Sequence, residues 1–199
     1  MNKKIKEMAY LAIFTSLIIL MTFVPFIGYI TIGIFSITTI PLVVITGTII
    51  LGLKGGIWLS LMFGVFSLIR ATMPGTIADP MFLNPLISIL PRILFGVATY
   101  YTFRGMQIVK NNHLRYALTY LLATLFHTLI VCVMFAIIKP MWFIDTISAV
   151  NGTYPFIDNI WMVVVMAFLI NGALEAVIGT VVGPFIMKAY KGNLEVHND

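Results

Sequence analysis

The sequence predicts an all-α integral membrane protein, a single bundle of six transmembrane helices formed by residues 1–199. The composition is the first reason: 60% of the 199 residues are hydrophobic and only 10% are charged, against about a quarter charged in soluble domains. The second is that apolar segments recur, each near the roughly 20 residues that a helix needs to cross a bilayer. The third is that most basic residues lie between these segments.

Each predicted span is an apolar run that ends at a charge, a proline or a glycine turn. The first follows a basic start and closes near Pro25; it is too long for a signal peptide and no small-residue cleavage site follows. The Lys54-Gly55-Gly56 turn separates the second span from the third. Pro41 and Pro91 are expected to bend their helices, because proline removes a backbone donor. The predicted spans are residues 6–26, 36–53, 56–72, 84–104, 114–138 and 157–188.

An even number of spans puts both termini on one side, and the positive-inside rule places that side in the cytoplasm. The outer segments and the spans then hold only Arg70, Arg92 and Lys139 among the basic residues. Loops 26–35, 73–83 and 139–156 face outward and are long enough to cover a site. The inner segments hold the remaining basic residues: Lys3, Lys4, Lys6, Lys54, Arg104, Lys110, Arg115, Lys188 and Lys191.

Several function classes are not supported by any pattern in the chain. The net charge of +5 follows membrane topology, and no basic, aromatic patch predicts nucleic-acid binding. Cys132 is the single cysteine, which excludes an intrachain disulfide and a cysteine metal cluster; no other metal-ligand spacing is found. Neither a nucleotide-binding loop nor a nucleophile–base constellation is present. We therefore expect no catalytic residues, no metal and no cofactor.

The main candidate for ligand binding is a polar stripe in the fourth span. Asn84, Ser88 and Arg92 fall at i, i+4 and i+8 and share one helix face. Arg92 would lie about 12 Å below the outer boundary, where an unpaired charge is costly and usually functional. Its guanidinium fits a ligand carboxylate, or else an internal ion pair or a carbonyl cap. Asn84 and Ser88 bind ligand hydroxyl or amide groups, or cap the helix start.

Each of the other polar residues inside the spans has a structural and a functional interpretation. Arg70 snorkels to the interface or binds ligand, and His127 is a core histidine or a ligand contact. Asn171 would line the bottom of a pocket, with Trp161 as an interfacial aromatic or part of its wall. Glu175 would lie about 26 Å down, too deep to pair directly with Arg92, and is a proton relay, a structural hydrogen bond or a partner contact.

Small residues mark a docking face on the first span. Ala9, Ala12 and Ser16 recur at spacings that allow close helix approach. Internal packing and docking against a separate membrane subunit are the two interpretations.

At this point the sequence resembles the substrate-binding S components of energy-coupling factor (ECF) vitamin transporters, over nearly the whole chain. The family's small-residue motif Ala-x-x-x-Ala appears as Ala12-Ile-Phe-Thr-Ser16, with serine at its second position. Two stretches look most like the pantothenate-specific members: FVPFIGYITIGIFSITTIPLVVITGTIILGLKGG and FSLIRATMPGTIADPMFLNPLISILPRILFG.

The resemblance implies a binding subunit in a bacterial cell membrane that captures a vitamin from outside. Its partners would be a transmembrane coupling protein and two ABC ATPases, which use the ATP. Pantothenate fits a site where Arg92 holds the carboxylate while Asn84, Ser88 and Asn171 address the neutral polar groups. Another vitamin (biotin, folate, riboflavin or cobalamin) is the alternative within the family. A membrane-embedded enzyme and a stand-alone carrier are the alternatives from other classes.

Overall fold

The computed structural model describes residues 3–24, 26–32, 35–73, 79–138, 165 and 168–196. Its elements follow one another along the chain as helices interrupted by a single strand pair. They are α1 (Lys3–Phe23), β1 (Tyr29–Ile32), β2 (Phe35–Thr38), α2 (Ile40–Arg70), the 3-10 helix η1 (Asp79–Leu83), α3 (Pro85–Ser88), α4 (Leu90–Gly105), the 3-10 helix η2 (Met106–Ile108), α5 (Asn112–Ile138), the π-helix η3 (Phe168–Gly172) and α8 (Ala173–Val196).

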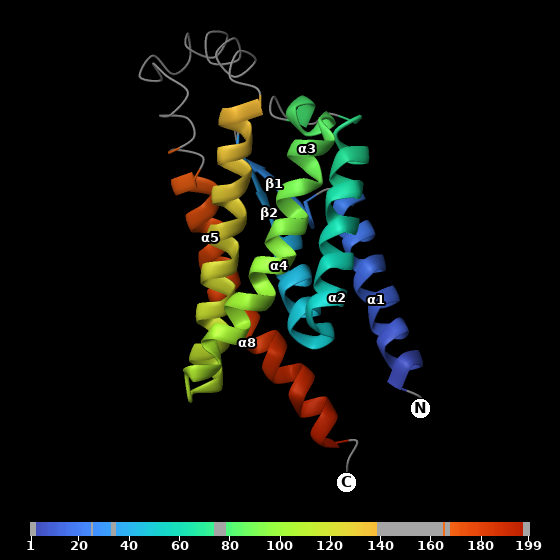
Figure 1. Ribbon diagram of the computed structural model, residues 1–199, viewed down its shortest axis with the longest axis vertical. Coiled ribbons are helices and arrows are strands. Elements are labelled where there is room, and N and C mark those ends of the chain that lie inside the picture. The colour runs from blue at the N-terminus through green and yellow to red at the C-terminus, as the bar shows by residue number, and fades with distance from the viewer. Residues whose placement is uncertain are drawn as a thin grey trace.

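Within these ranges five helical segments are long and apolar enough to cross a membrane. They stand side by side in a bundle (Figure 1), with α2 packed on α1 and α4, and α5 packed on α4 and α8. The first turn of α1 and the last turn of α8 lie at the same end (Figure 1). We call this the basic end, since Lys3, Lys4 and Lys6 lie in α1 at this end.

The helix α2 folds back on itself at Gly52, which has φ +73° and is the non-helical residue inside it. In a straight helix, residues 47 and 59 would lie about 18 Å apart. Instead, Gly47 faces the Leu59 side chain so closely that an added Cβ would clash with it, and a Cβ on Gly56 would lie 2.6 Å from Thr48 Cγ2. The element is therefore two antiparallel arms, which correspond to the predicted second and third spans.

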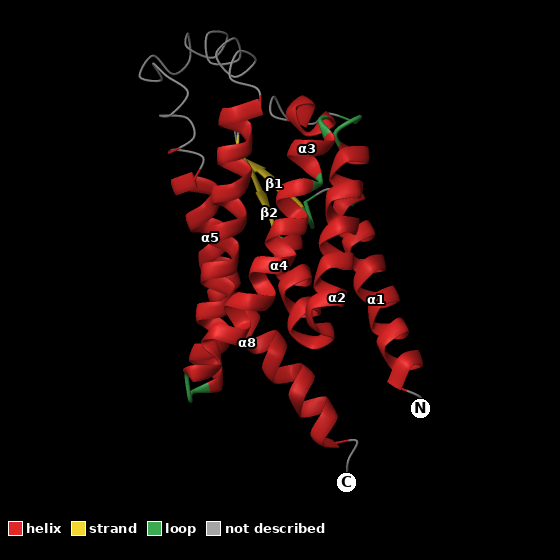
Figure 2. Ribbon diagram, viewed as in Figure 1, coloured by secondary structure: helices red, strands yellow, loops and turns green. Residues whose placement is uncertain are grey.

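The prediction of an all-α fold is wrong between the first two helices. Strands β1 and β2 form an antiparallel hairpin in which Tyr29 pairs with Thr38 and Ile32 with Phe35. Residues 36–38, assigned to the second span, belong to this hairpin, and the first arm of α2 has only residues 40–51. Figure 2 shows the strands at the height of the helices rather than beyond their ends. Non-helical backbone at that depth is tolerated where protein surrounds it or it lines a cavity.

Glycines set the closest helix contacts in the bundle. A Cβ on Gly96 of α4 would lie 2.7 Å from the Gly56 carbonyl oxygen of α2. Gly183 of α8 contacts the Tyr120 ring of α5 so closely that a Cβ at this position would overlap the ring. Tyr120 is fully buried and its hydroxyl shares a 2.5 Å hydrogen bond with Thr46 Oγ1, so the α5–α8 pair is joined to the first arm of α2.

Some of the remaining predicted spans agree with helices of the structure, and others are divided or only partly described. The helices α1 and α5 lie close to the predicted spans 6–26 and 114–138. The span 84–104 is divided into α3 and α4. The described part of the sixth span consists of η3 and α8, together with residue 165; residues 157–164, and with them Trp161, lie outside the described residues.

Candidate functional site

The position of Arg92 follows from the proline that precedes it. In a continuous helix the amide of residue 91 would donate to the carbonyl of Ile87, but Pro91 has no N–H. The helix breaks at Ile89, between α3 and α4. Arg92 Nη1 donates to the Ile87 carbonyl oxygen instead, at 2.7 Å. The predicted bend at Pro91 is therefore a break, and the side chain that fills it is the candidate ligand-binding arginine.

Aromatic rings enclose the Arg92 guanidinium. Its Cζ lies 5.3 Å from the Phe63 ring centroid and 4.8 Å from that of Phe82. The side chain is 4% exposed, and its Nε has no hydrogen-bond partner among the described residues. A buried guanidinium of this kind retains donor capacity for a carboxylate or carbonyl oxygen.

His127 continues this aromatic layer toward α5. Its ring lies 5.8 Å from Phe63 and 4.7 Å from Phe95, one turn along α4 from Arg92. The imidazole is buried, and neither ring nitrogen has a partner in the described part of the chain. A neutral histidine brings one donor and one acceptor, so the residue offers both to a ligand.

The other two members of the predicted stripe have structural partners. Asn84 is the N-cap of α3, where its side chain accepts a hydrogen bond from the Leu86 amide at 3.0 Å. Ser88 is buried and donates to the Phe82 carbonyl oxygen. Since this bond folds η1 back over α3, Ser88 acts on Arg92 indirectly, by holding the Phe82 ring over it.

Arg70, at the end of α2, has two partners among the described residues. Its Nη1 forms an ion pair with Asp79 Oδ1 at 3.0 Å, and its Cζ lies 4.0 Å from the Tyr29 ring centroid. The Tyr29 hydroxyl in turn shares a 3.0 Å hydrogen bond with Ser67 Oγ. Burial raises the pKa of Tyr29 above its usual value, so the hydroxyl stays neutral. The cluster ties the hairpin, the end of α2 and η1 together.

The depth predicted for Glu175 is wrong, as the register of α8 on α5 shows. A Cβ on Gly172 would lie 3.2 Å from Thr128, and one on Gly179 would lie 3.4 Å from Thr124. Glu175 falls between these contacts, at the level of His127. Since Arg92 is one turn from Phe95, which contacts His127, about one helical pitch of 5 Å separates the levels of Arg92 and Glu175.

Glu175 is bound to the hairpin. Its Oε1 accepts a hydrogen bond from the Thr38 amide at 2.7 Å, and the residue is 7% exposed. Asn171 lies one turn earlier, and its buried Oδ1 has no partner among the described residues. The interior therefore holds a guanidinium, a carboxyl group and several polar atoms without partners among the described residues, all within a few helical turns.

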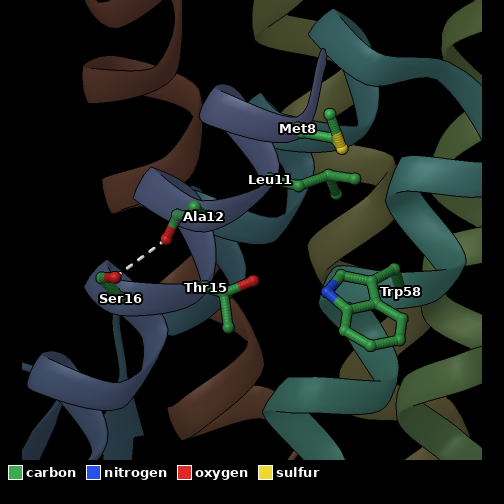
Figure 3. Close-up of a pocket in the computed structure, with 6 residues that line it drawn as sticks. All are labelled: Met8, Leu11, Ala12, Thr15, Ser16 and Trp58. Carbon is green, nitrogen blue, oxygen red and sulfur yellow. Dashed lines mark hydrogen bonds between the residues drawn. The ribbon is translucent and has the colours of Figure 1, made fainter. Parts of the chain in front are cut away.

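A separate groove lies on α1, in the half of the helix toward the basic end. Ala12 and Ser16 are among the residues that line it (Figure 3). The groove has a volume of about 380 Å³. Ser16 donates to the Ala12 carbonyl oxygen at 2.8 Å, which turns its hydroxyl back onto the helix. Ala9 is exposed on the same helix but does not line the groove. The lining residues are Met8, Leu11, Ala12, Thr15, Ser16 and Trp58.

Comparison with known proteins gives this arrangement its context. The family model described as "ECF transporter, substrate-specific component" matches residues 6–187. The chain belongs to this family. It is thus a transporter component and not an enzyme, and it works in the membrane.

This S component is also similar to a curated protein, the pantothenate transporter PanT of Leuconostoc mesenteroides subsp. mesenteroides. The two are 31% identical over 115 residues, which cover 55% of this chain and 56% of that protein. The alignment therefore spans about half the length of the relative.

Sequence reasoning missed the aromatic rings around Arg92 and His127 of this S component. Phe95 could have been identified from the sequence, because it lies one turn beyond Arg92 on the same helix. Phe82 precedes the cap residue Asn84 by two positions, yet only the fold of η1 brings it over the guanidinium. Phe63 and the pairing of Glu175 with Thr38 depend on inter-helix register, for which the sequence carries no direct signal.

Proposed function

We propose that this chain is the vitamin-binding subunit of an ECF-type ABC importer and that its ligand is pantothenate. The observation that carries the proposal is Arg92, a buried guanidinium among aromatic rings with an unpartnered Nε. A carboxylate is the group that such a donor recognises best. The similarity to a pantothenate transporter favours pantothenate over other carboxylate-bearing vitamins.

The chemistry of pantothenate matches the polar atoms that lack partners. Its carboxylate suits Arg92, and its amide, with one donor and one acceptor, suits the imidazole of His127. Its hydroxyls are donors for the Asn171 Oδ1. Because buried polar atoms are left unpaired when the ligand lacks the matching group, such a site discriminates strongly between analogues.

The orientation in the membrane follows from charge. We propose that the basic end lies in the cytoplasm of a bacterial cell, because positive residues are retained on that side. Besides the lysines of α1, that end includes Lys54 beside the Gly52 turn and Arg104 at the end of α4. The hairpin, η1 and α3 then face outward, and the vitamin enters between them toward Arg92.

We further propose that the groove on α1 is the docking site of an ECF transmembrane coupling protein. Two ABC ATPases bound to that coupling protein would supply the energy. The groove combines the small residues Ala12 and Ser16 with the exposed ring of Trp58. Small residues let a partner helix approach closely, and van der Waals packing is the main source of affinity between helices in lipid. ATP is used by the partner and not by this chain.

The proposal is tested by titrating the purified chain in detergent with a panel of vitamins. We expect submicromolar binding of pantothenate, no comparable binding of biotin, folate, riboflavin or cobalamin, and no ATPase activity. Uptake into liposomes should require the ECF module. Tight binding of a different vitamin would replace the ligand assignment, and uptake by the chain alone would indicate a stand-alone carrier.

A further inference from the structure

Glu175 is a buried acid whose binding capacity is only partly used. Among the described residues, Glu175 Oε1 accepts a hydrogen bond from the Thr38 amide, and the Thr128 side chain is a second hydrogen-bonding neighbour of the carboxyl group. A carboxylate has about four acceptor positions, and burying an ionised group is costly unless its hydrogen bonds are made. Within the described residues, the ion pair in the structure joins Arg70 to Asp79 and does not involve Glu175.

Arg92 and Glu175 are a basic and an acidic side chain at neighbouring levels that form no ion pair. The register of α8 on α5 puts Glu175 at the level of His127, and the contact of His127 with Phe95 links that level to α4. Arg92 and Glu175 are therefore about 5 Å apart along the bundle. Each is turned to backbone instead: Arg92 to the Ile87 carbonyl and Glu175 to the Thr38 amide. Fixed in this way, the two side chains stand at separate positions in one interior and do not contact each other as an ion pair.

The polar atoms beside Glu175 include acceptors that have no partner among the described residues. Asn171 is at i−4 from Glu175 on the same side of the helix, and its Oδ1 is buried without a partner among the described residues. His127, at the same level on α5, has two unpartnered nitrogens. A group that enters here is therefore met by acceptor oxygens and by an imidazole, whereas at Arg92 it meets donors.

We propose that Glu175 is a specificity-determining residue that accepts hydrogen bonds from the hydroxyl end of the ligand, while Arg92 holds its carboxylate. This inference rests on the proposed function and adds a second recognition point to it. It defines the substrate class as a carboxylate joined to a segment that carries hydroxyl donors. A monocarboxylate with an apolar far end would leave the buried Glu175 without donors and would be rejected.

The test pairs a change in the ligand with a change in the protein. Pantothenate and its analogue with both hydroxyls replaced by hydrogen are titrated against the wild-type chain and Glu175→Gln. The wild type should bind the analogue about 100-fold more weakly. Glu175→Gln should lose about 10- to 100-fold in pantothenate affinity, the effect of a hydrogen bond to a charged group, and bind the analogue within about threefold of wild type.

The same titrations distinguish the inference from its rivals. If Glu175→Gln weakens both ligands equally, Glu175 only anchors the hairpin and the inference is wrong. If the wild type binds neither ligand, the pantothenate assignment itself fails. Glu175→Asp, which keeps the charge but shortens the side chain, serves if the glutamine variant does not fold, and should show a smaller loss of selectivity. Thr180→Val, five residues further along α8, is the control and should leave the selectivity unchanged.

Discussion

Gly96 is the point where α4 approaches α2 most closely, and it tests how the site is held in place. In Gly96→Ala, the new Cβ would lie 2.7 Å from the Gly56 carbonyl oxygen and 2.9 Å from Ser60 Cβ. The carbonyl oxygen is backbone, so it cannot yield by changing a rotamer. Overpacking of this kind costs about 1–3 kcal/mol. The site is affected as well, because Phe63, which contacts Arg92, lies one turn beyond Ser60.

For a chain of this length, about 2–4 °C of melting temperature is lost per kcal/mol. We therefore expect Gly96→Ala to melt about 2–12 °C below wild type in detergent, followed by circular dichroism, and to bind pantothenate more weakly. Gly105→Ala is the matched control on the same helix: no atom lies within 4 Å of its new Cβ, and its melting temperature should be unchanged or slightly higher. Equal melting of Gly96→Ala and wild type would refute the described contact between α2 and α4.

Two further predictions separate structural from binding roles. Asn84→Ala should lower the stability by about 1 kcal/mol through loss of the α3 cap, whereas Asn84→Ser should keep both the stability and a pantothenate Kd within threefold of wild type; a stable Asn84→Ser variant that loses affinity would make Asn84 a ligand contact. Ala12→Leu should fill the groove on α1 and reduce uptake by the reconstituted transporter at least tenfold while binding by the isolated chain is unchanged. Ile13→Leu, at an exposed position outside the groove, is its control, and equal uptake by the two variants would exclude the groove as the docking site.

The helices were predictable because bilayer-length apolar runs leave few alternatives. The hairpin was not. Residues 29–38 form an apolar run with many β-branched side chains, and hydropathy alone does not tell a buried strand from a helix segment. The end of the second span was predicted from Gly52 and the Lys54-Gly55-Gly56 turn, and the chain reverses at Gly52, which has a positive φ.

The candidate site was predictable only in part. A lone arginine in an apolar helix is expensive enough to be noticed from sequence, and the structure buries Arg92 among aromatic rings. The face shared by Asn84, Ser88 and Arg92 was predicted to present three free polar side chains, whereas Asn84 caps α3 and Ser88 bonds to the Phe82 carbonyl oxygen. The depth of Glu175 required the register between α5 and α8, which glycine contacts determine and hydropathy does not.

The central claim is that Arg92 recognises the carboxylate of pantothenate. The most direct measurement compares pantothenate with pantothenol, its alcohol analogue, on the wild-type chain and on Arg92→Gln. We predict that the wild type prefers pantothenate by about 100-fold or more, and that Arg92→Gln, folded by size-exclusion chromatography, binds the two ligands within about threefold of each other. An Arg92→Gln variant that keeps the wild-type preference for pantothenate would contradict the account.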